Sequence, residues 1–177
     1  VYKRQSESGV STGSIYTRFG DKAGLFSAVV KPAADGLMEL YLESITAARE
    51  SGDPAEATSQ GNEGTELVLK YIYENFDVFK LIFCHSAGTE YERYFDELAE
   101  IEEKYYREFV KQFSRRENMV SDFFIHVICR TGWSYIYEVV SHDLSYDEAQ
   151  IFMKSIREFC FAGWGKVLGQ NYEDLGL

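Results

Sequence analysis

The segment Gly9–Phe19, with the sequence GVSTGSIYTRF, lies just before a long stretch of helical periodicity. Gly9 can end a helix in the left-handed conformation that other residues avoid. Ser11 is a good N-cap for a short second helix that runs from Thr12 to Phe19. A helix, a glycine-containing turn and a short helix together form a helix-turn-helix unit. The sequence therefore predicts such a unit near its start.

The predicted short helix carries small polar residues on one face, namely Gly13, Ser14 and Thr17. Short hydroxyl side chains let a helix approach a nucleic-acid groove closely and reach phosphates or base edges. Lys22, at the start of the next helix, is placed to meet a phosphate with help from the helix N-terminus. This pattern favours contact with DNA.

The charge of the chain is uneven. The 177 residues carry a net charge of −11, yet residues 1–31 hold five basic and two acidic side chains. A small basic head on a large acidic body is typical of a protein that contacts nucleic acid through one end. Chance clustering of lysine and arginine in a short window is the alternative interpretation.

The composition predicts an all-α protein. The chain is 45% hydrophobic and 16% aromatic, and it contains only two prolines, so it can bury a core and favours helices over strands. No apolar run approaches the ~18 residues of a membrane span, and no signal sequence opens the chain. Three distant cysteines fit reduced thiols, so we expect a cytoplasmic protein with no membrane partner. Because the chain begins at Val1 rather than Met, we expect its true N-terminus to lie upstream.

Apolar residues recur at helical spacing in five further segments. The first contains Pro32, which predicts a kink near residues 28–31 or, alternatively, the start of a separate helix. A linker rich in turn-forming residues is expected at 51–64. Ser145 and Glu148 predict a capping box before the last helix. The expected helices span residues 21–49, 65–84, 90–113, 119–140 and 145–168.

Eighteen positions resemble the helix-turn-helix signature of the TetR family of bacterial transcriptional regulators: Gly9-Val10-Ser11-x-Gly13-x-Ile15-Tyr16-x-x-Phe19-x-x-Lys22-x-x-Leu25-Phe26. The resemblance implies a homodimer that binds operator DNA and holds a small-molecule effector in its helical body. It divides the chain into residues 1–31, a partial helix-turn-helix without its first helix, and residues 32–177, a regulatory bundle for ligand binding and dimerisation.

The resemblance also assigns roles within the motif. It implies that Tyr16 and Lys22 hold the DNA backbone. Gly24 departs from a strong helix start and is expected to weaken the first turn of the following helix. The groove-facing residues would be Ser11, Thr12, Gly13, Ser14 and Thr17, and the core residues Val10, Ile15, Phe19, Leu25 and Phe26.

Aromatic and small residues in the body give two further candidate sites. Helical bundles hold apolar pockets between their helices, and the candidate pocket residues are Phe79, Phe83, Tyr105, Phe109, Trp133 and Tyr137. The segment 119–140 is apolar nearly all round, so we expect it to be covered on both sides, with a partner subunit on one of them. The candidate dimer residues, from the last two helices, are Phe124, Ile128, Phe159, Gly163, Trp164 and Val167.

Catalytic and metal chemistry find little support. His126 and Cys129 lie three residues apart, but no second ligand pair accompanies them, so we predict core or pocket residues and no metal. The acidic residues between Glu90 and Glu103 are spread as on a solvated helix face. We expect no cofactor and no enzyme activity, since no phosphate loop or nucleophile motif occurs.

The sequence thus predicts a ligand-responsive DNA-binding transcriptional regulator, a repressor released by a small apolar or amphipathic effector. The alternative is an α-helical small-molecule-binding protein or enzyme whose N-terminal segment matches a helix-turn-helix by chance.

Overall fold

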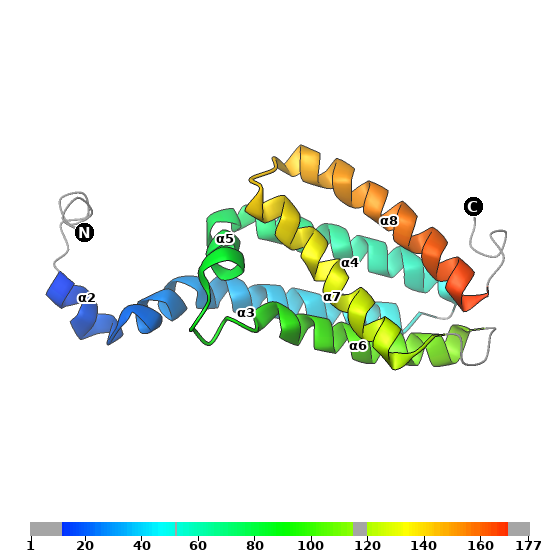
Figure 1. Ribbon diagram of the computed structural model, residues 1–177, viewed down its shortest axis with the longest axis horizontal. Coiled ribbons are helices and arrows are strands. Elements are labelled where there is room, and N and C mark those ends of the chain that lie inside the picture. Colours follow the sequence, from blue (N-terminus) through cyan, green and yellow to red (C-terminus); the bar gives the residue numbers. More distant parts are fainter. Residues whose placement is uncertain (1–11, 52, 115–119, 170–177) are drawn as a thin grey trace.

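The computed structural model describes residues 12–51, 53–114 and 120–169, without the side chains of Thr12, Ile15 and Pro54. These residues form seven helices and no strand, so the predicted all-α class is confirmed (Figure 1). Gly9, Val10 and Ser11 lie outside the described residues. The helices are α2 (Thr12–Phe19), α3 (Lys22–Arg49), α4 (Pro54–Glu74), α5 (Phe76–His85), α6 (Tyr94–Phe113), α7 (Asp122–Ser141) and α8 (Tyr146–Leu168).

Five long helices, α3, α4, α6, α7 and α8, form the body, and the short α5 lies at the end nearest α2 (Figure 1). Helix α2 packs against the start of α3 and projects beyond the body. The proposed boundary after residue 31 falls inside α3, so one helix belongs to both predicted parts of the chain.

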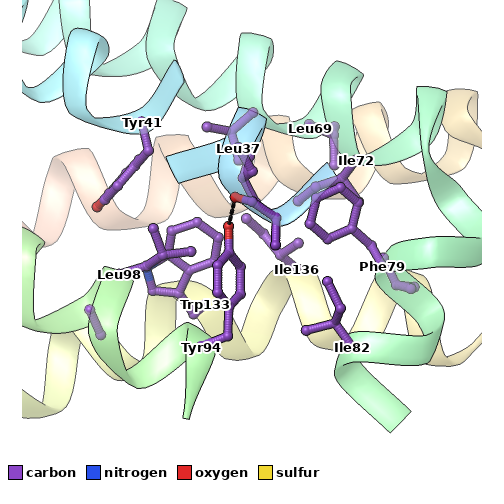
Figure 2. Close-up of a cluster of buried hydrophobic side chains, with 14 of the residues drawn as sticks. Leu37, Tyr41, Leu69, Ile72, Phe79, Ile82, Tyr94, Leu98, Trp133 and Ile136 are labelled. Carbon is purple, nitrogen blue, oxygen red and sulfur yellow. Dashed lines mark hydrogen bonds between the residues drawn. The ribbon is translucent and has the colours of Figure 1, made fainter. Parts of the chain in front are cut away.

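The core lies where α3, α4, α5, α6 and α7 meet. Leu37, Ile72 and Phe79 are fully buried there (Figure 2). The buried Tyr94 hydroxyl donates a hydrogen bond of 2.6 Å to the Ala34 carbonyl, drawn as the dashed line in Figure 2. This bond joins the beginning of α6 to α3. Breaking it would leave a buried hydroxyl without a partner, which is costly.

Helix α3 runs without interruption through Pro32. The expectation of two separate helices meeting at Pro32 is therefore wrong. Proline removes one backbone hydrogen bond and crowds the preceding turn, and Figure 1 shows the axis of α3 changing direction in this region. Asp21 caps the helix, since its side chain accepts a 2.8 Å hydrogen bond from the Gly24 amide.

Gly24 permits a tight junction between α2 and α3. A Cβ at this position would lie only 2.1 Å from the Phe19 carbonyl oxygen. Gly20, between the two helices, has a φ of +77°, a conformation that glycine adopts without strain. Gly24, which the sequence predicts only to weaken the first turn of this helix, is thus required by the close approach of the α2 and α3 backbones.

The predicted linker at 51–64 is wrong, because α4 already begins at Pro54. Asp53 accepts hydrogen bonds from the amides of Ala55 and Glu56 and caps the helix, and proline is favourable in a first helical turn. The turn-forming residues at the start of this segment therefore cap and begin a helix instead of forming a linker. Gly64 lies within α4, where an added Cβ would be 2.9 Å from the Ser44 Cβ of α3.

Two other predicted helices have different bounds. The helix expected at 65–84 is divided at Asn75, which ends α4 and precedes α5. The helix expected from residue 90 begins at Tyr94, and the one expected from residue 119 begins after its cap, Ser121. The capping box of Ser145 and Glu148 is confirmed, and Gly169 ends α8 with a φ of 72°. In the described part of the chain no helix is both long and apolar enough to cross a membrane.

Candidate functional site: a cavity in the helical body

A cavity of about 260 Å³ lies between α3, α4, α6, α7 and α8. Small residues provide its space: Ala57, Gly61 and Gly64 come from α4 and Gly132 from α7. Large aromatic side chains enclose it from the other helices. These are Tyr41 from α3, Tyr105, Tyr106 and Phe109 from α6, Trp133 and Tyr135 from α7, and Phe161 and Trp164 from α8.

The aromatic walls are held by ring contacts. Tyr106 and Trp164 stack with parallel rings whose centroids are 4.9 Å apart. Tyr41 meets Trp133 edge to face at 5.2 Å, an arrangement that suits the quadrupoles of aromatic rings. Contacts of this kind join α3 to α7 and α6 to α8, so the rings have defined orientations around the cavity.

One acid, Glu102 of α6, faces this aromatic space. Among the described residues it has no ion pair and no hydrogen bond. Burial raises the pKa of Glu102 to about 8, while the nearby Tyr41 hydroxyl acts in the opposite direction and Glu103 adds to the rise. The carboxyl group is therefore mainly protonated at neutral pH and loses its proton near pH 8.

The Tyr41 hydroxyl is a buried unsatisfied polar group beside the cavity. Its oxygen is buried, and it has no hydrogen-bond partner among the described residues. It lies near enough to Glu102 to favour the ionised carboxylate, but not in hydrogen-bonding geometry. Buried polar groups in native proteins are nearly always paired, so an exception in a cavity is a candidate contact for a ligand.

Arg157 of α8 also lines the cavity, but its charge is already compensated. Its Nη1 lies 2.7 Å from the carboxylate of Glu66 on α4, and that acid is exposed. The pair closes the space between α4 and α8. Glu102 is thus the acid that leaves the cavity with an uncompensated charge when it ionises.

Glu103, the next residue, differs from Glu102 because basic side chains surround its carboxylate. Its carboxylate contacts His126 Nδ1 at 2.9 Å, Arg107 Nη2 at 3.0 Å, and Arg130. Burial alone would raise the pKa of Glu103, but these three neighbours lower it below its ordinary value. The prediction of a solvated acidic face is therefore wrong for Glu102 and Glu103, which point between helices.

The structure brings together three of the six candidate pocket residues, Tyr105, Phe109 and Trp133. The other three lie elsewhere. Phe79 is fully buried in the core, Phe83 stacks on Phe95 with ring centroids 3.7 Å apart, and the 40% exposed Tyr137 packs edge-on against Phe83.

The candidate dimer residues divide between cavity and surface. Ile128 and Trp164 line the cavity, and Phe124 packs edge-on against Trp164 at 5.6 Å. Val167 is half-buried. Phe159 is 72% exposed, and Gly163 is exposed with open space around it. In the single chain α7 is not covered on both sides, since Phe123 is 74% exposed.

Helical spacing gives a signal for the functional residue that the sequence analysis missed. Glu102 occupies the same helix face as Leu98, Tyr105 and Phe109, at intervals of three or four residues. An acid within an apolar stripe is expected to face the interior. Tyr41 offers no such signal, because its hydroxyl is unpartnered only as a result of the tertiary arrangement.

Helix α2 presents the polar face predicted for DNA contact. Gly13, Ser14, Thr17 and Lys22 are exposed, and Tyr16 is 54% exposed. The Thr17 hydroxyl donates to the Gly13 carbonyl at 2.8 Å and retains its acceptor capacity. The motif residues assigned to the core, Phe19, Leu25 and Phe26, are half-buried.

His126 and Cys129, the candidate metal ligands, do not come together in the described part of the chain. No group of three potential metal ligands occurs there, and His126 faces Glu103 rather than Cys129. Burial raises the pKa of the Cys129 thiol, which keeps it protonated and unreactive.

Comparison with known proteins adds no relative. No family model, curated protein or solved structure matches the chain significantly.

Proposed function

We propose that the chain is a ligand-responsive DNA-binding regulator, a repressor that a small effector releases from its operator. The observation that carries this proposal is the course of α3. Its first turn packs against the polar helix α2, and its second half supplies Tyr41, Ser44, Ile45 and Ala48 to the cavity. One continuous helix therefore joins the proposed DNA-reading element to the proposed effector site.

The mechanism follows from this connection. A ligand that fits the cavity better with one tilt of α3 shifts the population toward that tilt, and only its differential affinity can drive the shift. The tilt moves α2, which projects beyond the body (Figure 1). The hydrogen bond of Tyr94 to Ala34 fixes α3 to α6 between the two ends, so this point is a natural pivot.

A second copy of the chain completes the proposal. Ile151 and Phe159 of α8 are 70% and 72% exposed, and Phe123 of α7 is 74% exposed. Large apolar side chains of this kind mark interaction surfaces when they are grouped. A two-fold axis on α7 and α8 would cover them and pair two α2 helices for two half-sites of DNA.

Selection from random duplex DNA with the protein expressed from its complete gene tests the proposal. We expect a palindromic sequence with half-sites about 34–36 Å apart or a multiple of that distance, and an affinity that falls steeply with salt. Tyr16→Ala with Lys22→Ala should weaken binding at least about tenfold, because it removes two exposed contacts from the head.

The control removes exposed side chains from helices outside both α2 and the proposed dimer surface. Lys70→Ala with Lys104→Ala changes two exposed lysines, one on α4 and one on α6, and should leave DNA affinity unchanged. If no sequence is enriched, or if both double variants bind equally, the DNA-binding role fails. A cavity that still binds a ligand would then favour the alternative, a helical small-molecule-binding protein.

A further inference from the structure

The cavity combines one uncompensated acid with aromatic walls, and these features select a chemical class of ligand. We propose that it binds a small lipophilic monocation, an aromatic amine or ammonium, with Glu102 as its counter-ion. This inference deepens the effector-binding half of the proposed function and is independent of DNA binding.

The first argument is the charge of the lining. Arg157 is paired with Glu66 at 2.7 Å, whereas Glu102 has no ion pair among the described residues. An ionised carboxylate removed from much of the solvent is costly until an opposite charge approaches it. A cation relieves this cost, and an anion would increase it.

The second argument is the wall. Tyr105, Tyr106, Phe109, Trp133 and Trp164 surround the same space as Glu102. The faces of such rings carry negative partial charge and attract cations, most strongly where water is excluded. The unpartnered Tyr41 hydroxyl adds an acceptor oxygen for an N–H group of the ligand.

The third argument is size. At about 30 Å³ per molecule of liquid water, the cavity of about 260 Å³ holds the volume of about nine waters. A single aromatic ring with a short ammonium group fits within this space.

The proposal predicts that cation binding releases a proton. Burial raises the pKa of Glu102 to about 8 in the free protein, so a cation must displace the proton that Glu102 holds at lower pH. The other ionisable groups that face it are Tyr41 from α3, Tyr105 and Tyr106 from α6, Cys129 from α7, and Arg157 and Cys160 from α8. Burial raises the pKa values of these tyrosines and cysteines above their ordinary ranges.

His126 is the remaining ionisable neighbour, because its Nδ1 lies 2.9 Å from the Glu103 carboxylate on the side of α6 that faces α7. A permanently charged ligand excludes titration of the ligand itself. With such a ligand, affinity should rise up to about fiftyfold between about pH 6 and pH 8 and then level off. The rise should persist in His126→Gln.

The test compares phenyltrimethylammonium with tert-butylbenzene, which has the same shape without the charge. The two tryptophans of the chain, Trp133 and Trp164, both line the cavity, so selective tryptophan fluorescence reports occupancy. We expect the cation to bind at least about tenfold more tightly than its neutral isostere at pH 8, and Glu102→Gln to remove this preference. Glu97→Gln, an exposed acid on the same helix, should retain it.

The outcomes separate this inference from the proposed function. Equal binding of the two probes, or a preference that survives Glu102→Gln, overturns the counter-ion role and leaves an effector site in place. Binding of neither probe overturns the inference and also counts against the effector site. If Glu102→Gln does not fold, the ratio of the two probes in the unmodified protein and its pH dependence decide.

Discussion

Glu102 and Glu103 are neighbours on α6, yet their surroundings shift the pKa values of their carboxyl groups in opposite directions. Glu103 lies among His126, Arg107 and Arg130 at the seam with α7, and its pKa is lowered. Glu102 lies in the cavity without a counter-charge, and burial raises its pKa to about 8. Successive residues on a helix point about 100° apart, so one step along the chain leads from a satisfied acid to an unsatisfied one.

The difference separates an acid that joins two helices from an acid that is a candidate for ligand binding. The Glu103 cluster joins α6 to α7 and gives the Glu103 carboxylate three basic partners. Glu102 costs stability whenever it ionises, and no described residue of the protein compensates for this. An acid kept in such a place is a candidate for binding, because perturbed groups collect at functional sites.

The largest expected effect is the pH dependence that Glu102 imposes on stability. In the unfolded chain this carboxyl loses its proton near pH 4.5, but in the folded protein only near pH 8. Between these values the folded state binds the extra proton, so the free energy of unfolding falls as pH rises. Relative to Glu102→Gln, the unmodified protein should lose on the order of 2–4 kcal/mol between about pH 5 and pH 9.

Urea unfolding of both proteins across this range measures the difference. Glu97→Gln is the matched control and should follow the unmodified protein at every pH. Parallel curves for the unmodified protein and Glu102→Gln would show that Glu102 titrates normally, and the contrast between the two acids would be lost.

Removing the charge of Glu103 should change the free energy of unfolding by a smaller amount and in the opposite direction: it should destabilise the protein. Glu103→Gln removes the negative charge that Arg107, His126 and Arg130 share, and we expect a loss of about 2 kcal/mol at neutral pH. Glu100→Gln, which removes only surface contacts to Arg93 and Arg130, should cost less than about 1 kcal/mol. Urea unfolding at pH 7 compares the two variants. Equal costs would mean that the cluster contributes nothing beyond surface pairing.

The sequence predicts those features of the fold that have local causes. The all-α class, the start of α3 after Asp21 and the capping box of Ser145 depend on side chains within a few residues of one another. The break at Asn75 is not marked by a strong local signal. The segment that begins at residue 51 resembles a linker because helix-capping residues, such as Asp53, also form turns.

The candidate site was predictable only in part, for the same reason. Tyr105, Phe109, Trp133 and Phe79 all belong to rows of apolar residues at helical spacing. This periodicity cannot show which row faces a cavity and which row packs in a filled core. Small residues on a different helix decide this, for example Gly61 and Gly64 of α4. Glu102 could have been identified from its position in the stripe, whereas its missing partner is a property of the assembled bundle.

The smallest expected effect distinguishes the two buried tyrosines that pack on the core. The Tyr94 hydroxyl donates to Ala34 at 2.6 Å, and the Tyr41 hydroxyl has no partner among the described residues. Tyr94→Phe should therefore cost about 1 kcal/mol. Tyr41→Phe should change stability by less than about 0.5 kcal/mol, because it removes no hydrogen bond and keeps the ring against Trp133.

The Tyr41 hydroxyl also favours the ionised form of Glu102, so Tyr41→Phe should move the pH dependence of stability toward higher pH. Unfolding curves of both variants measured across the pH range test these points together. A Tyr41→Phe cost equal to that of Tyr94→Phe would mean that a water molecule satisfies the Tyr41 hydroxyl, and the cavity would then offer a ligand one polar contact fewer.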